Sequence, residues 1–449
     1  MVNIDVMVFK RKIYEKMKAW KNLSQGETAL LIEGARRIGK STIVEEFAKK
    51  EYESYIIVDF NEASPAVKSL FDDLMDLDRI FLYLQATYHV TLKKRKSVIV
   101  FDEVQQCPKA RQAIKYLVKD GRYDYIETGS LISIQRNVRD ITIPSEEERI
   151  QMFPMDYEEF RWALGDENTL PLLRTFWGHK TPLGAAFRTV SRDLRLYMLV
   201  GGMPQAVNAY LTTQDMRRVD SVKRNIVRLY ADDFGKLDAS GRLSNMYLAI
   251  PSLLSRNVSR YVPSSVVGQM SASVEEDFIQ QLEQSKAVNI AYHVDDPNVG
   301  MTANASRYKL FASDTGLFVT LAFWDKDFTE NSIYEKLLGD KLSANLGYVY
   351  ENLVAQMLVS SGNKLYYHTW LRDEKHYYET DFLLSRGNKI VPIEVKSSGY
   401  STHASLDAFC KKYSSRIGQR YLVYTKDLRQ DAETILLPVC LLPCLGEER

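Results

Sequence analysis

Eight consecutive residues, Gly34 to Ser41, constrain the fold of this 449-residue chain more than any other feature. They read Gly-Ala-Arg-Arg-Ile-Gly-Lys-Ser; an apolar run, Ala29–Ile32, precedes them, and a helical pattern continues from Thr42. The glycines let the backbone curl so that its N–H groups face an anion, and the N-terminus of the following helix adds partial positive charge. The pattern is typical of a loop that binds nucleotide phosphates between a strand and a helix.

This segment, which we call the phosphate loop, supplies the candidate contacts to ATP. We expect the Lys40 ammonium to hold the β- and γ-phosphates and the Ser41 hydroxyl to ligate Mg²⁺. We expect the side chains of Arg36 and Arg37 to point outward or to bind a partner element. The predicted nucleotide-contacting residues of the loop are Gly34, Ala35, Arg36, Arg37, Ile38, Gly39, Lys40, Ser41 and Thr42.

A second apolar run, Ser97–Phe101, ends in two carboxylates, Asp102 and Glu103. An acidic pair at the end of such a strand can place one carboxylate beside Mg²⁺ and the other beside the attacking water. We therefore expect Asp102 to bind Mg²⁺ and Glu103 to polarise the attacking water. Ser130, after a third run, is predicted either to sense the γ-phosphate or to cap a turn.

Short apolar runs alternate with helical patterns between Thr28 and Arg149, which predicts an α/β fold. Near-continuous apolar strands are buried on both faces, so we expect a parallel sheet with helices on each side. The predicted strands are Ala29–Ile32, Tyr55–Phe60, Ser97–Phe101 and Tyr125–Thr128. Ahead of them, residues 9–20 predict an amphipathic cover helix with a solvated basic face.

Composition excludes several classes of protein. Hydrophobic residues make up 45% and charged residues 26% of the chain, as in globular proteins, so a disordered or fibrous chain is excluded. Four cysteines do not form a disulfide framework. The N-terminus lacks the apolar core of a signal peptide, and no apolar run reaches the ~20 residues of a membrane-spanning helix. We expect a soluble cytoplasmic protein that does not contact a membrane.

The pattern changes after Arg149, and four domains are predicted. Residues 1–160 form the phosphate-binding domain. In residues 161–260 the apolar side chains recur with the period of a helix, so we expect a helical lid. Residues 261–335 combine short helices with strand-like pieces, Val288–His293 and Tyr308–Phe311, which is compatible with a winged helix. Residues 336–449 form a further α/β domain.

The phosphate loop, the acidic pair and Thr128-Gly129-Ser130 together resemble the AAA+ ATPases, specifically the archaeal-type and STAND-like branch. Further motifs resemble one prokaryotic family that joins such an ATPase to a C-terminal nuclease-like domain of unknown function; they are FPMDYEEF, YMLVGGMPQAV, DTGL and YENLVAQ. The resemblance implies that an arginine, often from a neighbouring subunit, completes the nucleotide site. Arg149 lies where this residue is expected, with Arg195 as an alternative, and a residue acting in trans would require at least a dimer.

Near the C-terminus, carboxylates and a lysine follow a regular spacing. Asp381 precedes Glu394-Val395-Lys396 across two predicted strands, Thr380–Leu384 and Lys389–Lys396. Glu394 and Lys396 share one strand face because side chains alternate with period two. If the strands pair, Asp381 and Glu394 converge on one divalent ion, and Lys396 lies ready to orient water. Glu351, on a helix ahead of both strands, adds a further carboxylate.

This arrangement resembles the PD-(D/E)XK nuclease fold, whose active members hydrolyse phosphodiesters with Mg²⁺. The resemblance implies catalytic roles for Glu351, Asp381, Glu394 and Lys396, with the metal on Asp381 and Glu394. An ordinary cross-strand charge pair is the alternative for Glu394 and Lys396. Nearby basic and aromatic residues suit contacts to DNA, although they also suit a solvated surface.

We therefore expect a Mg²⁺-dependent AAA+ ATPase that controls a C-terminal, DNA-interacting, nuclease-like domain. The alternative is a slow nucleotide-dependent switch or docking protein whose nuclease-like domain is inert and binds nucleic acid or a protein. The net charge of the chain, +1, argues neither for nor against a nucleic-acid partner.

Overall fold

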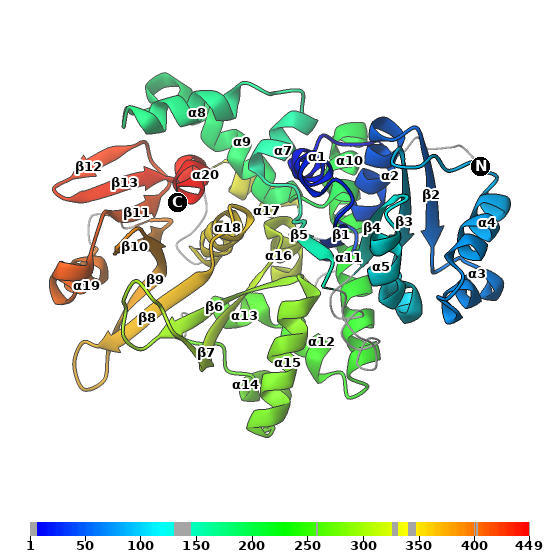
Figure 1. The fold of residues 1–449 in the computed structure, drawn as a ribbon. Helices are drawn as coiled ribbons and strands as arrows, with labels where there is room; N and C mark the ends of the chain where they lie inside the picture. The colour runs from blue at the N-terminus through cyan, green and yellow to red at the C-terminus, as the bar shows by residue number, and fades with distance from the viewer. Residues whose placement is uncertain are drawn as a thin grey trace. The chain divides into compact units, whose positions relative to one another are not determined.

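The computed structural model of the protein describes residues 7–129, 145–256, 259–325, 331–339, 347–398, 400 and 403–448. The chain forms two compact units, whose helices and strands are labelled in Figure 1. The first unit comprises residues 1–153 and 284–286, and the second comprises residues 154–283 and 287–449.

The first unit contains a five-stranded parallel sheet in the order β2-β3-β4-β1-β5. Its strands are β1 (Ala29–Glu33), β2 (Ser54–Asp59), β3 (Ser97–Asp102), β4 (Asp124–Gly129) and β5 (Glu147–Gln151). The four predicted strands and their parallel pairing are confirmed. The edge strand β5 is not among the predicted strands, because its charged residues leave no apolar run.

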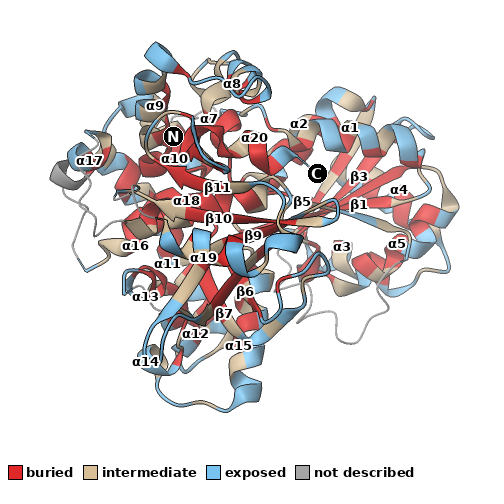
Figure 2. Ribbon diagram, turned by 90° about the vertical axis from the view of Figure 1, so that its left-hand side faces the viewer, coloured by how far each residue is buried: buried red, intermediate tan, exposed pale blue. Residues whose placement is uncertain are grey.

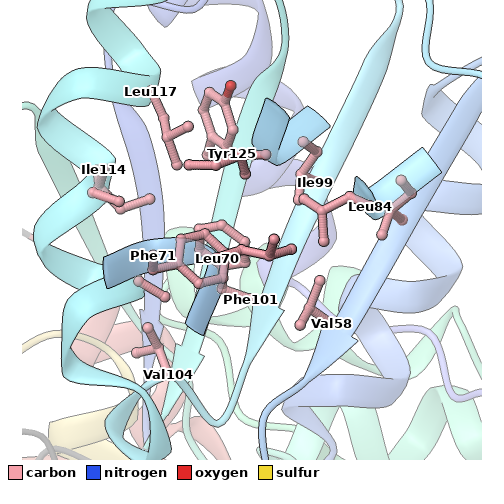
Figure 3. Close-up of a cluster of buried hydrophobic side chains, with 14 of the residues drawn as sticks. Val58, Leu70, Phe71, Leu84, Ile99, Phe101, Val104, Ile114, Leu117 and Tyr125 are labelled. Atoms are coloured by element: carbon pink, nitrogen blue, oxygen red, sulfur yellow. The ribbon is translucent and has the colours of Figure 1, made fainter. Parts of the chain in front are cut away.

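Helices cover both faces of this sheet, as predicted. The helices are α1 (Ile13–Ser24), α2 (Lys40–Glu51), α3 (Pro65–Ser69), α4 (Leu77–Tyr88) and α5 (Pro108–Asp120). Figure 3 shows the core on one face, where Ile99 and Phe101 of β3 lie among side chains of α4, α5 and the turn at Leu70 and Phe71. Helix α2 packs against β2, β3 and β4 through buried residues such as Phe47. Strands β1 and β3 are buried along their whole length (Figure 2).

The predicted N-terminal cover helix is α1, which buries Ile13, Met17 and Trp20. The expectation of a wholly solvated basic face is wrong at Arg11, which is only 5% exposed. Its guanidinium donates hydrogen bonds to the carbonyls of Ile38, at 2.8 Å, and Phe153, at 2.7 Å. A buried guanidinium needs such acceptors, and here they tie the segment before α1 to the phosphate loop.

The second unit contains helices and one eight-stranded sheet in the order β12-β13-β11-β10-β9-β8-β6-β7. The helices before the sheet are α7 (Tyr157–Ala163), α8 (Thr169–Gly178), α9 (Phe187–Val200), α10 (Pro204–Thr213), α11 (Met216–Leu237), α12 (Arg242–Leu248), α13 (Ile250–Leu254), α14 (Ser264–Val267) and α15 (Ala272–Ser285). The strands are β6 (Val288–Val294), β7 (Ala303–Ala312), β8 (Leu365–Leu371), β9 (Tyr377–Arg386), β10 (Lys389–Lys396), β11 (Arg420–Tyr424), β12 (Arg429–Asp431) and β13 (Thr434–Pro438). The helices among and after them are α16 (Thr315–Ala322), α17 (Asn331–Leu338), α18 (Gly347–Ser360), α19 (Ala404–Lys412) and α20 (Leu442–Glu447).

The sheet joins two segments that the sequence analysis assigns to different domains. Strands β6 and β7 lie in the predicted winged-helix segment, yet β6 pairs in parallel with β8 of the predicted C-terminal domain. The boundary expected at residues 335 and 336 therefore falls inside one hydrogen-bonded sheet. Local periodicity identifies β6 and β7 as strands but carries no information about which distant strand completes their hydrogen bonds.

Three sequence motifs that are far apart in the chain meet in the interior of the second unit. The Asp314 carboxylate accepts hydrogen bonds from the backbone N–H groups of Gly202, at 2.5 Å, and Leu317, at 2.8 Å. The Gln356 side-chain amide donates to the Tyr197 hydroxyl at 2.8 Å, and its oxygen accepts from the Thr315 N–H at 2.8 Å. We call these contacts the buried joint; they connect α9, α16 and α18.

The buried joint explains Gly201, because a Cβ there would lie 2.4 Å from Asp314 Oδ1, and a backbone contact with Met155 explains Gly202. A Cβ on Gly202 would lie 2.0 Å from the Met155 carbonyl oxygen and 2.7 Å from the Met155 nitrogen. The Gly202 carbonyl also accepts from the Met155 N–H at 2.7 Å, so the two backbones pair directly. Only a residue without a side chain permits this approach.

We predict that Gly202→Ala destabilises the second unit by about 2 kcal/mol or more, because the added methyl meets backbone atoms that cannot rotate away. Gly178→Ala is the matched control, since a Cβ there meets nothing within 4 Å and Gly178 ends helix α8. Thermal unfolding followed by circular dichroism should show a lower midpoint for Gly202→Ala and an unchanged or slightly higher one for Gly178→Ala. Equal midpoints would contradict the tight approach.

Candidate functional site

The phosphate loop runs from the end of β1 to the first turn of α2, as the motif predicts. Gly34 is required by packing, because a Cβ there would lie 2.5 Å from the Met152 carbonyl oxygen. Gly39 adopts a φ of 93°, a left-handed conformation that glycine takes without strain, and α2 begins directly after it. Arg37, also left-handed with a φ of 65°, is exposed, in agreement with the predicted outward orientation; Arg36 is half-buried.

The Lys40 side chain is folded back onto the phosphate loop. Its ammonium donates to the carbonyls of Gly34, at 3.0 Å, and Ala35, at 2.8 Å, and the residue is 6% exposed. Burial lowers the pKa of Lys40 to about 8, although the nearby carboxylates of Glu103 and Asp102 act in the opposite direction. The ammonium is thus held inside the loop at the place where a phosphate would meet it.

The predicted metal ligands of the first unit are in contact. The Ser41 hydroxyl donates to Asp102 Oδ1 at 2.9 Å, and the Thr128 hydroxyl donates to the same carboxylate oxygen. A hydroxyl and a carboxylate are hard oxygen ligands of the kind Mg²⁺ prefers, so these residues fit that ion. Parallel strands β1, β3 and β4 end at one edge of the sheet and therefore deliver these groups together.

Glu103 follows β3 in a left-handed conformation with a φ of 52°. Its backbone N–H donates to the Thr128 hydroxyl at 3.3 Å, and its carboxylate accepts a hydrogen bond from the Gln105 side chain. A non-glycine residue with a positive φ carries strain that the surrounding hydrogen bonds must hold. Neither Thr128 nor Gln105 is predicted from the sequence to contact the acidic pair.

Three further residues are predicted to belong to the nucleotide site. Arg149, on β5, pairs with Glu147 at 2.8 Å and with Glu33 at 3.5 Å, and its side chain is 45% exposed. Arg195 lies on α9 in the second unit and donates to the Leu338 carbonyl at 3.2 Å. Ser130 lies outside the described residues.

In the second unit, three carboxylates converge. Oxygens of Glu351 on α18 and of Glu379 and Asp381 on β9 all lie within 4.8 Å of one another. We call this group the carboxylate cluster. Burial, and then the charges of Glu351 and Glu379, raise the pKa of Asp381 well above its ordinary value. Asp381 Oδ2 also accepts the Val395 N–H at 2.7 Å, which fixes the carboxyl against β10. The three oxygen donors fit a hard divalent ion such as Mg²⁺.

The structure does not bring Glu394 into the carboxylate cluster as expected. Strands β9 and β10 pair antiparallel, and Glu394 and Lys396 share a face of β10. However, Glu394 Oε1 pairs with the Lys396 ammonium at 3.0 Å, and Oε2 accepts the Leu406 N–H at 3.1 Å, in the first turn of α19. Each oxygen of Glu394 therefore has one partner within the protein.

Two residues of this site were missed by the sequence analysis. Glu379 had a usable signal, because it lies two residues before Asp381 and therefore on the same face of β9. Lys309, on β7, pairs with Glu351 at 3.1 Å and Glu379 at 2.5 Å. No signal in the sequence indicates Lys309, because its position depends on the order of strands in the sheet.

The β8–β9 hairpin carries basic and aromatic side chains at its outer end. Leu371 and Tyr377 are each 61% exposed there, and the Arg372 guanidinium lies 5.6 Å from the centre of the Tyr378 ring. On α19, the Lys412 ammonium lies 5.8 Å from the Trp370 ring centre. Such cation–aromatic pairs offer both charge and stacking surface.

Comparison with family models finds three matches along the chain. Residues 26–161 match an AAA domain, residues 191–327 match a domain of unknown function (DUF8612), and residues 346–442 match another domain of unknown function (DUF4143). The first match includes the phosphate loop, so the N-terminal part of the chain is similar to an AAA domain with a P-loop. No curated protein matches the sequence.

Solved structures similar to the chain include PCH-2 of Caenorhabditis elegans, with 11% identity, 47% of this chain and 66% of that chain covered, and a TM-score of 0.27. The chain thus spans slightly less than two thirds of PCH-2. The RuvB Holliday junction branch migration motor of Thermotoga maritima is 11% identical; the match covers 62% of this chain and 89% of that chain, with a TM-score of 0.28. A STAND protein with a tetratricopeptide repeat sensor from Pyrococcus horikoshii is 10% identical; the match covers 80% of this chain and 46% of that chain, with a TM-score of 0.28.

Within the described residues, no helix combines the length and apolar character needed to cross a lipid bilayer.

We predict that ATP binding takes up protons at pH 8.5. With a pKa of about 8, Lys40 is mostly neutral at that pH in the free protein, and contact with phosphates favours its charged form. Uptake of part of a proton per ATP follows, and affinity should fall as the pH rises through 8. Titration calorimetry in two buffers of different protonation enthalpy measures this uptake. Identical heats in both buffers would contradict the prediction.

Proposed function

We propose that the protein binds and hydrolyses ATP with Mg²⁺ at the phosphate loop. The observation that carries the proposal is the contact between Ser41 and Asp102, because it places a hydroxyl and a carboxylate together beside the buried Lys40 ammonium. The AAA-domain match over residues 26–161 supports the same conclusion. Bound Mg²⁺ would neutralise charge on the phosphates and orient them.

The roles of the surrounding residues follow from their positions. Lys40 binds the β- and γ-phosphates, Ser41 and Asp102 hold the metal, and Glu103 orients and polarises the attacking water. The N–H groups of residues 34–42 bind phosphate oxygens. Arg149 is half-exposed, and within the described residues its ion pairs are with Glu33 and Glu147 of its own sheet, so we propose that it contacts the nucleotide of a neighbouring copy.

We predict that Glu103→Gln lowers kcat for ATP hydrolysis by about 100-fold or more while ATP binding persists, because the carboxylate acts on water rather than on the nucleotide. Lys40→Ala should abolish binding. Glu62→Gln, an exposed acidic residue of the same unit, is the matched control and should hydrolyse ATP normally. Steady-state phosphate release and calorimetric ATP binding separate the three cases. Normal turnover by Glu103→Gln would contradict the assigned role.

We further propose that the eight-stranded sheet of the second unit, with α18 and α19, forms a nuclease-like domain that acts on DNA under the control of ATP. The carboxylate cluster is the observation behind this proposal, because three oxygen donors on α18 and β9 suit a Mg²⁺ ion that would activate water and polarise a phosphodiester. Lys396 would stabilise negative charge on the phosphate. The pair that it forms with Glu394 would position this lysine beside the cluster.

The β8–β9 hairpin supports DNA as the substrate. Arg372 and Lys375 supply positive charge to phosphates, and the exposed ring of Tyr377 supplies a surface on which bases can stack. The alternative is a nucleotide-dependent switch or docking protein whose nuclease-like domain is inert. It is favoured by the engagement of both Glu394 oxygens within the protein.

We predict that labelled duplex or single-stranded DNA is cleaved with Mg²⁺ or Mn²⁺, and that Asp381→Asn abolishes cleavage. Lys40→Ala should change the rate if ATP controls the domain. Asp431→Asn, exposed on β12 of the same sheet, is the matched control. The absence of cleavage under all conditions, with ATP hydrolysis intact, would overturn the nuclease proposal and support the inert alternative.

A further inference from the structure

Lys309 is a cation built into the carboxylate cluster. Its ammonium lies 3.1 Å from Glu351 Oε1 and 2.5 Å from Glu379 Oε1, and its side chain is only 5% exposed. Burial alone would lower the pKa of Lys309, but Glu351, Glu379 and Asp381 outweigh burial and raise this pKa well above its ordinary value. The lysine is therefore held as an ammonium against the same carboxylates that would bind a metal.

The cluster is assembled from two segments of the chain that match different family models. The carboxylates lie within residues 346–442, whereas Lys309 lies within residues 191–327. The sheet brings them together, because β7 and β6 extend the sheet beside β8 and α18 packs across β7, β8 and β10. Lys309 thus comes from a different segment of the chain than the carboxylates whose charge it neutralises.

A metal ion and the ammonium would be close neighbours in this cluster. A Mg²⁺ ion lies about 2.0–2.1 Å from its oxygen ligands, and the three carboxylate oxygens here lie within 4.8 Å of one another. An ion among them would lie only a few ångströms from the Lys309 ammonium. Two positive charges at so short a distance repel strongly where water is largely excluded. The Lys309 ammonium therefore lowers the affinity of the cluster for the metal ion, and a bound metal ion weakens the contacts of the ammonium.

We propose that Lys309 is a tethered counter-ion that occupies the carboxylate cluster in competition with a divalent cation, so that tight metal binding requires its side chain to withdraw. The inference rests on the proposed nuclease-like function and adds a means of regulating that site. Lys309 acts through the carboxylates and is a regulatory residue rather than a catalytic one.

The position of β7 permits such a withdrawal. Strand β7 is at the edge of the sheet and pairs with β6 as its one neighbouring strand among the described residues. The β6–β7 ladder is interrupted by a register shift at Tyr292 and His293. Edge strands and irregular ladders have fewer hydrogen bonds to break than central strands do. A change in β7 would therefore move Lys309 while β9 and its two carboxylates stay in place.

Titration of the full-length protein with Mn²⁺ in the absence of nucleotide, followed by electron paramagnetic resonance, tests the proposal. Lys309→Met should bind Mn²⁺ about tenfold or more tightly than the wild type does, and this gain should disappear in the Lys309→Met/Asp381→Asn double variant. Lys309→Arg, which keeps the charge, should show no gain. Lys389→Met removes a lysine from β10 of the same sheet and is the matched control.

Thermal unfolding provides a second readout. Without metal, Lys309→Met should unfold at a lower temperature than the wild type, because three carboxylates then lack their counter-ion. Saturating Mn²⁺ should raise its midpoint more than that of the wild type. If Lys309→Met does not fold, Lys309→Gln replaces it, since a neutral amide still donates hydrogen bonds to Glu351 and Glu379.

Mn²⁺ affinity that is unchanged or weaker in the neutral variants would overturn the competition between Lys309 and metal. A gain that survives the loss of Asp381 would overturn it as well, because the ion would then bind elsewhere. Neither result depends on DNA cleavage, so failure of this inference is distinguishable from failure of the nuclease proposal, which is judged by cleavage in the wild type.

Discussion

Charged side chains that are kept from water impose the strictest constraint on this protein, because each must find a partner whose geometry is supplied by the fold. Lys40 finds the carbonyls of Gly34 and Ala35, Asp314 finds the N–H groups of Gly202 and Leu317, and Lys309 finds Glu351 and Glu379. The partners of Lys309 lie on other elements, those of Lys40 lie in the loop directly before its helix, and Asp314 caps α16 while also binding Gly202 after α9. These pairings therefore fix loops and helices against their sheets.

The two candidate sites use this constraint differently. At the phosphate loop, one element supplies the ammonium together with its carbonyl acceptors, and the edge of a parallel sheet adds Asp102 and Thr128. The motif of residues 34–41 is local, whereas Asp102 and Thr128 come from two further strands of the same parallel sheet. The carboxylate cluster draws on α18, β9 and β7, and its charge balance depends on a lysine from a different part of the sequence.

The buried joint gives the second unit its internal connection. Tyr197, Asp314 and Gln356 belong to motifs that the sequence analysis identified without assigning them a role. In the structure they hydrogen-bond to one another's segments, so the packing of α9 and α16 is linked to that of α18, which carries Glu351. A polar network of this kind favours one arrangement of the helices, because any other arrangement leaves a buried donor or acceptor unsatisfied.

The sequence by itself determined the phosphate loop, the four apolar strands around it and the acidic pair after β3. These features depend on local spacing and on the period of side chains along a helix or strand, which the chain displays directly. Only the tertiary structure decided that Arg11 is buried, that β6 and β7 join the C-terminal sheet, and that Glu379 and Lys309, rather than Glu394, complete the carboxylate cluster. The reason is that hydrogen bonds between distant strands, and the partners of buried charges, are set by the order of elements in space, which local sequence does not encode.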